Sequence, residues 1–334
     1  MKNFVYFRPA TAEQAVGLLA PDWGPTELLA GGTDLLDLQK EYIAQPDKVV
    51  SLSGLAQLNA IAVAKDGGSA FIGAGVKLAE IATALRDRFP ALATAAGAIG
   101  GPQIRNMGTL GGNLCQRNRC WYFRDEHTHC LLKGGEKCFA KNGENRYHAI
   151  FGTDKPCVIV HPSTLAPALI ALGATAEVLG PKEKRTVEVA KLFRAPTSAK
   201  EREHILAPNE ILLGVMVPGK LGTNVANASY EVRHKQSYDW PLVQAAVSFT
   251  PRDGKATDVR IVLGHVAPTP ILATEAAKAI EGEAITEESA TKAGQAAAKG
   301  ARPLSQNAYK VKLVEVAVKR ALLTAAGAKK YWEV

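Results

Sequence analysis

Hydrophobic and polar positions along this chain predict short strands that are followed, after a turn, by short helices. The segment FVYFRPATAEQAVGLLA (residues 4–20) predicts a strand, a turn at Arg8 and Pro9, and then a helix. Thr11 is a typical N-cap residue, and Gln14 occupies the capping-box position three residues later. The chain therefore opens with a strand, a turn and a helix.

The same pattern continues through most of the first 220 residues. The stretch ELLAGGTDLLDLQK (27–40) predicts an apolar strand, a glycine turn and an amphipathic segment, and KVVSLSGL (48–55) predicts a further strand. The stretch SAFIGAGVKLAEIATAL (69–85) predicts a strand, a turn and a helix. A strand, a helix and a strand are expected in 158–180, and a last strand in 210–218. This alternation is typical of an α+β or α/β protein.

A second unit is expected after PGKLGTN (218–224), which has the composition of a linker. The prediction is thus two domains, residues 1–220 and 222–334. The second domain is expected to end in a helix, because VKLVEVAVKRALLTAA has apolar residues at helical spacing. Its predicted strands lie in SYEVRHK, LVQAAVSFTP and DVRIVLGHVAP.

Composition is that of a soluble globular protein, with 47% hydrophobic and 22% charged residues in 334. The start MKNFVYFRPA lacks the apolar core of an export signal, and no uncharged run predicts a membrane-spanning helix. We therefore expect no membrane insertion and, by default, a cytoplasmic location. The net charge of +8 comes from basic residues interleaved with acidic ones. No basic run alternates with aromatic residues, so a nucleic-acid partner is not expected.

Two glycine-containing segments, AGGTDLL (30–36) and MGTLGGNL (107–114), are candidates for binding an anion. Glycines let successive backbone N–H groups approach a phosphate closely. Thr33 and Thr109 can add hydroxyl groups, and Asn113 can add an amide. Neither segment has the Rossmann or the Walker A spacing. Two interpretations stay open: ordinary tight turns, or two loops that together bind a diphosphate.

All five cysteines lie between Cys115 and Cys157, which indicates a function for clustered thiols. No C-x-x-C pair is present, so the usual zinc-finger and bacterial ferredoxin spacings are absent. An iron–sulfur cluster, an irregular zinc site and unligated thiols all fit this spacing. His127 and His129 are alternative ligands. Several basic residues could offset the negative charge of a four-thiolate cluster, namely Arg117, Arg119, Arg124, Lys133 and Lys137.

Four motifs carry a resemblance to a known family: LLAGGTDLL, QIRNMGTLGGNL, HPSTLAPAL and VRIVLGHVAPTP. Together they resemble the medium, FAD-binding subunit of the xanthine dehydrogenase family of molybdenum hydroxylases. The cysteine segment resembles an insertion found in a subgroup that carries a [4Fe-4S] cluster beside the FAD. That subgroup includes bacterial periplasmic aldehyde oxidoreductases and, more distantly, 4-hydroxybenzoyl-CoA reductases.

The resemblance implies an α+β fold. A vanillyl-alcohol-oxidase (PCMH) type FAD-binding domain in two subdomains would occupy residues 1–220, with the cysteine-rich insertion at about 115–158. A small α+β C-terminal domain of the CO-dehydrogenase flavoprotein type would follow at 222–334.

The resemblance also implies roles for residues. Thr164 stands where the family usually has an aspartate that contacts FAD, and Lys235 stands where a basic residue lies near the flavin ring. Cys115 would be a buried thiol near the flavin. The cluster ligands would be Cys120, Cys130, Cys138 and Cys157. The FAD-binding residues would be Leu28, Leu29, Ala30, Gly31, Gly32, Thr33, Asp34, Leu35, Gly108, Thr109, Gly111, Gly112, Asn113, Thr164, Leu212 and Lys235.

The function implied by the resemblance is electron transfer within a heterotrimer. A large partner would hold the molybdenum cofactor and hydroxylate the substrate, and a small partner would carry two [2Fe-2S] clusters. The FAD of this chain would pass electrons to an external acceptor, so the chain alone should not oxidise the organic substrate. A reductase with reversed electron flow, a self-contained flavin oxidase and a zinc-stabilised binding module are the alternatives. Relatives can reach the periplasm on a partner's twin-arginine signal.

Overall fold

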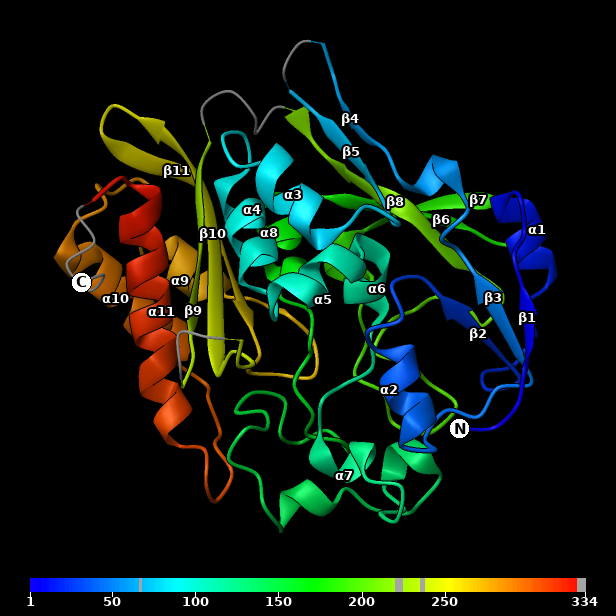
Figure 1. Ribbon diagram of the computed structural model, residues 1–334. Coiled ribbons are helices and arrows are strands. Elements are labelled where there is room, and N and C mark those ends of the chain that lie inside the picture. The colour runs from blue at the N-terminus through cyan, green and yellow to red at the C-terminus, as the bar shows by residue number, and fades with distance from the viewer. Residues whose placement is uncertain (66–67, 220–224, 235–237, 329–334) are drawn as a thin grey trace.

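Three β-sheets organise the computed structural model, which describes residues 1–65, 68–219, 225–234 and 238–328 (Figure 1). Two sheets are built from strands up to β8 (Ile211–Val217), and the third from strands after residue 225. The predicted linker at 218–224 lies largely outside the described residues. No helix of the described chain is long and apolar enough to cross a membrane.

The first sheet is small and parallel, with strand order β1-β3-β2. Its strands are β1 (Val5–Phe7), β2 (Thr26–Leu29) and β3 (Lys48–Ser51), and its helices are α1 (Ala12–Gly17) and α2 (Leu35–Lys40). The Thr11 hydroxyl accepts from the Gln14 N–H, as predicted, and caps α1. The Gln14 side chain accepts from the Ala10 N–H, one residue before the N-cap.

The second sheet has five antiparallel strands in the order β4-β5-β8-β6-β7. Its other strands are β4 (Ile61–Val63), β5 (Ala70–Gly73), β6 (Thr175–Leu179) and β7 (Lys184–Glu188). The helices beside it are α3 (Leu78–Ala84), α4 (Pro90–Ala98), α5 (Pro102–Met107), α6 (Leu110–Cys115) and α8 (Leu165–Ala171). Two short 3-10 helices, η1 (Ala56–Leu58) and η4 (Val189–Lys191), complete this part.

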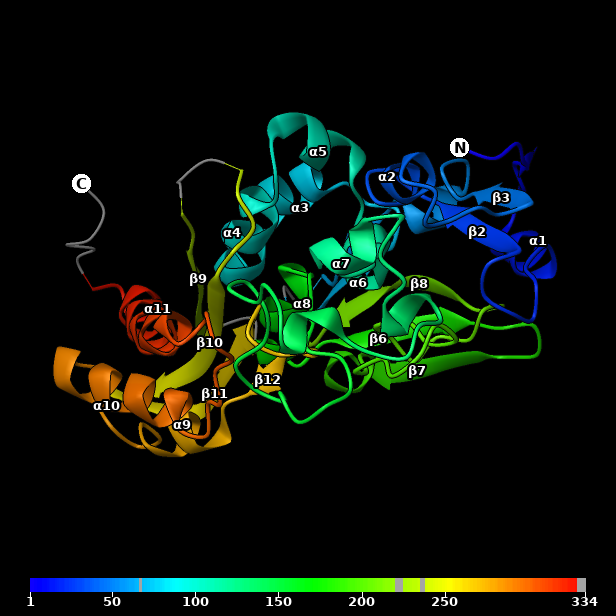
Figure 2. The same cartoon turned by 90° about the horizontal axis from the view of Figure 1, so that it is seen from below.

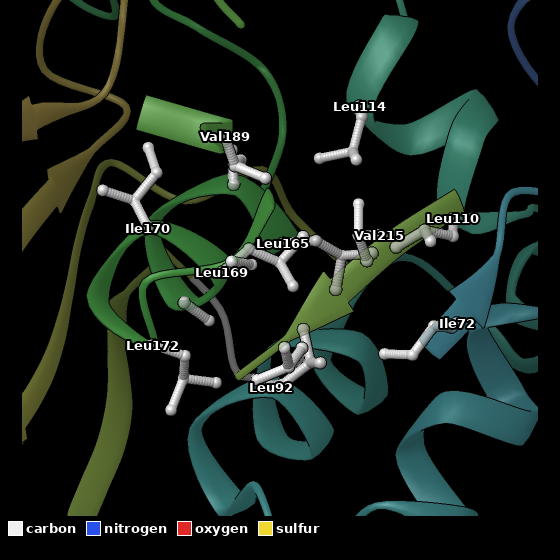
Figure 3. Packing of buried hydrophobic residues seen from close by; sticks show 14 of the residues in the cluster. Ile72, Leu92, Leu110, Leu114, Leu165, Leu169, Ile170, Leu172, Val189 and Val215 are labelled. Carbon is white, nitrogen blue, oxygen red and sulfur yellow. The ribbon is translucent and has the colours of Figure 1, made fainter. Parts of the chain in front are cut away.

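The main hydrophobic core lies between the second sheet and these helices (Figure 3). Leu165, Leu169 and Leu172 of the α8 region meet Val215 of β8, while Leu110 and Leu114 of α6 pack from another side. All five leucines are at most 1% exposed. This packing fixes α6, and with it the second glycine loop, against the sheet.

The third sheet is antiparallel, in the order β12-β11-β10-β9, and helices cover both of its faces (Figure 1). Helices α9 to α11 cover one face, while α4 and α8 approach the other. Its strands are β9 (Ala226–Val232), β10 (Val243–Arg252), β11 (Lys255–Gly264) and β12 (Ile271–Leu272). Its helices are α9 (Thr274–Lys278), α10 (Glu287–Ala298) and α11 (Tyr309–Ala325).

The cysteine-rich segment, residues 115–158, runs from the end of α6 below α2 and returns toward α8 (Figures 1 and 2). It contains only α7 (Trp121–Arg124) and the 3-10 helices η2 (Leu131–Lys133) and η3 (Phe139–Lys141). The strand predicted at 158–160 was wrong, because this stretch makes no sheet ladder. Strands β4 and β7 were not predicted, because both are short and largely polar or exposed.

Candidate functional site

A cavity of about 1010 Å³ lies between the two glycine loops, β8 and the loop that follows β9. Its size is at the upper end of the range for small-molecule and cofactor pockets, about 300–1000 Å³. Apolar and polar groups share its wall, including Leu28, Leu78 and Ile104 beside Asp34 and Arg233. The cavity can therefore hold a ligand that is large, partly apolar and partly charged.

The two glycine loops touch each other at the cavity wall. A Cβ atom on Gly31 would lie only 2.0 Å from the Met107 carbonyl oxygen, so this position has no room for a side chain. Gly32 has a φ of +77°, which favours glycine in the turn between β2 and α2. These glycines therefore bring backbone from two distant segments together on one surface.

The second loop is held by hydrogen bonds at its start. The Thr109 hydroxyl accepts from the Gly112 N–H and caps α6. The Leu78 N–H donates to the Gly108 carbonyl (3.0 Å), and the Lys77 Nζ donates to the Met107 carbonyl (3.0 Å). The Thr109 hydroxyl, expected to serve a ligand, thus first fixes its own helix.

Most residues predicted to bind the cofactor line this cavity. Leu29 lies in β2 and is absent from the cavity wall, and Lys235 lies outside the described residues. Residues expected from the sequence and found on the wall are Leu28, Ala30, Gly31, Gly32, Thr33, Asp34, Leu35, Gly108, Thr109, Gly111, Gly112, Asn113, Thr164 and Leu212.

Thr164 is buried on the cavity wall and contacts a carboxylate from another element. Burial raises the pKa of Glu231, although the charge of Arg233 and a hydrogen bond from Thr164 act in the opposite direction. Glu231 lies in β9, and Arg233 donates to it and to the Ala98 carbonyl. Glu231 is absent from the cavity wall, and the Thr164 hydroxyl lies 3.3 Å from His265 Nε2.

The Asn113 side chain stabilises the start of α8. Its Oδ1 accepts from the Ser163 hydroxyl at 2.6 Å and from the Leu165 N–H at 3.4 Å. The Gln116 side chain donates to the Asn113 carbonyl at 2.9 Å. The predicted role of Asn113 as an amide donor is therefore accompanied by a structural role as an acceptor.

Basic residues of the cysteine-rich segment pair with carboxylates of the first domain. Asp34 binds Arg124 (2.6 Å) and Arg119 (2.9 Å), and Asp37 binds Arg124 (2.8 Å). The Arg117 N–H also donates to Asp34. The interpretation that these arginines offset the charge of a cluster stays a prediction, and Arg117 pairs through its side chain with Glu203.

Two buried donors on the cavity wall have no hydrogen-bond partner among the described residues. They are Arg117 Nη2 and Arg119 Nε. The Arg119 guanidinium also stacks over the Trp240 ring, with its centre 4.7 Å from the ring centroid. Burial lowers the pKa of Arg119 to about 10, which still leaves it charged at neutral pH. Both nitrogen atoms are enclosed by protein, and both arginines form ion pairs, Arg117 with Glu203 and Arg119 with Asp34.

Four of the five cysteines gather in one apolar cluster with Leu38, Phe123, Leu132 and Ile159. Backbone amides act to lower the pKa of each of the four thiols. They are those of Tyr122 and Phe123 for Cys120, Leu132 and Lys133 for Cys130, Ala140, Lys141 and Val158 for Cys138, and Ile159 for Cys157.

Cys138 and Cys157 influence each other's ionisation. Their interaction lowers the pKa of the Cys138 thiol and raises the pKa of the Cys157 thiol. Cys115 differs, because it packs against the main core, lines the large cavity, and has its pKa raised to about 12 by burial alone. The structure therefore separates Cys115 from the other four.

The candidate histidine ligands do not join the thiols. The His127 imidazole is 86% exposed and lies beside Glu126. Among the described residues, no three His, Cys, Asp or Glu side chains converge closely enough to bind a single metal ion. The four thiols therefore gather without forming a preformed site for a single ion in the part of the chain that the structure describes.

Residues 2–220 match the family described as "FAD binding domain in molybdopterin dehydrogenase". The chain belongs to the FAD-binding subunits of this family. Residues 228–325 of this FAD-binding subunit match the "CO dehydrogenase flavoprotein C-terminal domain". The α+β fold with these two parts is confirmed, and with it the assignment to an oxidoreductase.

Similar proteins support this assignment. The chain is 37% identical over 276 residues to the aldehyde oxidoreductase FAD-binding subunit PaoB of Escherichia coli K12, covering 81% of this chain and 83% of that protein. It is 28% identical over 328 residues to the carbon monoxide dehydrogenase medium chain of Hydrogenophaga pseudoflava, with 96% of both covered. A solved carbon monoxide dehydrogenase from that organism superposes with a TM-score of 0.76 at 26% identity, covering 97% of this chain and 98% of that one.

Several cavity residues were not predicted from the sequence. Arg233, Tyr238 and Trp240 flank the predicted Lys235, so the same segment could have indicated them. Arg202 and His204 also line the cavity, and no local pattern marks them. They reach the site because the chain between β7 and β8 folds back beside Arg117.

Proposed function

We propose that this FAD-binding subunit carries a [4Fe-4S] cluster beside its FAD and transfers electrons within a molybdenum-dependent aldehyde oxidoreductase. The observation that carries the proposal is that Cys120, Cys130, Cys138 and Cys157 gather in one apolar cluster. Backbone N–H groups also act to lower the pKa of each of these thiols. Such donors stabilise the negative charge of thiolates that bind a cluster. Cys115 has no such donors.

The FAD would occupy the large cavity, with its diphosphate against the two glycine loops. Gly31 and Gly108 allow the backbone of the two loops to approach closely at the cavity wall. Arg117 and Arg119 also line this cavity and would add positive charge beside the diphosphate. When bound, FAD accepts electrons singly or in pairs, which suits a link between one-electron and two-electron partners.

The cluster would lie among the apolar side chains around the four thiols. Cys130 and Cys157 are 6% and 5% exposed, so the surrounding residues exclude most water. Burial raises the pKa of Cys120 to about 12, so without metal this thiol keeps its proton. Metal binding would displace that proton, as thiolate ligation requires.

The partners we propose are a large chain with the molybdenum cofactor and a small chain with two [2Fe-2S] clusters. The similarity to a protein named as an FAD-binding subunit of an aldehyde oxidoreductase supports an aldehyde as the substrate of the assembly. In this proposal the substrate is oxidised on the large chain, and the present chain delivers the electrons to an external acceptor.

The test is an anaerobic absorption spectrum with iron, zinc and FAD content, measured on the wild type and on two matched variants. We expect about four irons and one FAD in the wild type. Cys130→Ser should lose the iron and keep the FAD. Cys115→Ser removes a thiol of the same segment and should keep the iron.

Other results would contradict parts of the proposal. Zinc without iron would contradict the cluster. FAD without either metal would also contradict the cluster, and would indicate an FAD-binding subunit whose thiols bind no metal. Loss of iron from Cys115→Ser as well as from Cys130→Ser would contradict the proposed ligand set.

A further inference from the structure

The side chain of His148 contacts one of the four thiols. Its Nε2 lies 3.1 Å from the Sγ of Cys120. Among the described residues, it is the only side-chain nitrogen within hydrogen-bond distance of any of the four sulfurs. The imidazole is 3% exposed, so this contact is shielded from water.

The ring is held from several sides. Trp121 and Tyr122 pack against it, with centroid distances of 5.6 Å and 6.4 Å. The carbonyl of His148 accepts from Asn307 Nδ2 and from Lys310 Nζ, each at 3.2 Å. Asn307 and Lys310 belong to the C-terminal domain and are themselves buried. The C-terminal domain thus fixes the backbone of His148 through these two hydrogen bonds.

The two ring nitrogens have different surroundings. Nδ1 is buried and has no partner among the described residues, whereas Nε2 faces the sulfur. A thiolate carries no proton and can only accept, so a hydrogen bond between a Cys120 thiolate and His148 requires the proton to be on Nε2. A thiolate at Cys120 would then receive a hydrogen bond from His148.

We propose that His148 is a positioning residue for the cluster: its Nε2–H donates to the Cys120 thiolate, holds that ligand in place and raises the reduction potential of the cluster. The inference rests on the proposed function, because it needs a cluster at the four thiols. Its physical basis is that reduction adds negative charge, and a hydrogen bond to a ligand sulfur stabilises the more negative state. His148 is not a metal ligand in this proposal.

The experiment compares the intact protein, loaded with its cofactors, with three variants. His148→Leu removes the donor, and His148→Gln retains an amide donor of similar reach. His127→Leu is the matched control, because that imidazole lies in the same segment and is exposed. Iron per FAD is measured first, and the reduction potential of the cluster is then followed by electron paramagnetic resonance.

We expect His148→Leu to shift the potential to a more negative value, His148→Gln to restore part of the shift, and His127→Leu to leave it unchanged. An unchanged potential in an iron-containing His148→Leu protein would overturn the inference and leave the proposed function intact. An iron-free wild type would instead overturn the proposed function itself, and the inference with it.

If the His148→Leu variant does not retain iron, a measurement on the wild type tests whether His148 donates a hydrogen bond to a cluster ligand. With ¹⁵N-labelled histidine, the reduced cluster should show a weak nitrogen coupling in pulsed electron paramagnetic resonance, as expected for a hydrogen-bond donor. Absence of any histidine coupling would overturn the inference. A strong coupling would also overturn it, because it would make a histidine a direct iron ligand.

Discussion

At the residue scale, glycines determine the shape of the FAD cavity, because a position without a side chain lets two backbone segments approach each other closely. Gly31 allows the first loop to lie against Met107, and Gly111 packs where a Cβ would come within 2.9 Å of the Ala74 Cβ. The two loops therefore form one backbone surface. A single methyl group is enough to separate them.

We predict that Gly31→Ala weakens FAD binding and destabilises the fold by about 1–3 kcal/mol. The added Cβ would lie 2.0 Å from the Met107 carbonyl oxygen, so one loop must move. The ratio of flavin to protein absorbance and the thermal midpoint report both effects. Gly17→Ala is the control, because nothing lies within 4 Å of its Cβ position. Equal FAD content in the two variants would contradict this role of Gly31.

Charged residues are paired across long sequence distances. Asp34 pairs with Arg119 and Arg124, and Glu203 pairs with Arg117. Each pair joins one domain or segment to another. These ion pairs hold together the segments that surround the cavity.

At the element scale, the cysteine-rich segment has little secondary structure of its own and depends on its neighbours. At its start, Glu203 accepts from the Arg117 side chain at 2.8 Å and from the Asn118 backbone and side-chain amides at 3.0 Å and 2.7 Å. Near its end, Asn145 and Asn307 connect it to the turn before α11. The segment is thus held at both ends by elements outside it.

The buried Glu203 should make stability depend on pH. Burial alone would raise its pKa, but the Arg117 charge and the Asn118 hydrogen bonds outweigh burial and lower it from 4.5 to about 2. Because the folded state has the lower pKa, this stabilisation is complete above pH 4.5 and is lost as the pH falls toward 2.

We predict that Glu203→Gln lowers the free energy of unfolding at pH 7 by about 3–5 kcal/mol, because Arg117 loses its buried partner. The variant should also lose less stability than the wild type below pH 4.5. Urea unfolding at a series of pH values measures both effects. Glu188→Gln, which disrupts an exposed pair with Lys191, should change stability by less than about 0.5 kcal/mol. A parallel pH profile for wild type and Glu203→Gln would argue against this assignment.

At the scale of the whole molecule, the cavity and the thiol cluster lie on either side of one short stretch of chain. Cys115 lines the cavity, and Cys120, five residues later, belongs to the thiol cluster. Arg117 and Arg119 lie between them. In the proposed function this arrangement would place the two cofactors close together, as electron transfer between them requires.

We predict that the isolated chain, loaded with FAD, does not oxidise aldehydes. In the proposed function that chemistry belongs to the molybdenum cofactor of another subunit. Anaerobic addition of benzaldehyde should leave the flavin absorbance unchanged, whereas dithionite should bleach it and show that the flavin is reducible. Bleaching by the aldehyde alone would favour a self-contained flavin oxidase.

The sequence by itself determined the features that depend on near neighbours. The Thr11 cap and the glycine turn before α2 are set by residues a few positions apart and were predicted correctly. The alternation of strand and helix was predicted in part, because the strand at 158–160 is absent and β4 and β7 were missed. The resemblance of its motifs also indicated which residues line the cavity. That four of the five cysteines bind a cluster and Cys115 does not remains a prediction. The proximity of the four thiols supports it.

Only the tertiary structure decided how distant side chains complete the sites. Glu203 and Arg117 are 86 residues apart, and Asn307 and His148 are 159 apart. Glu231, in β9, lies near Thr164 at the start of α8. No periodicity or spacing encodes such pairs, because they form when packed elements bring buried charges and polar groups together. Burial then requires each group to find a partner, and that requirement is met in three dimensions rather than along the chain.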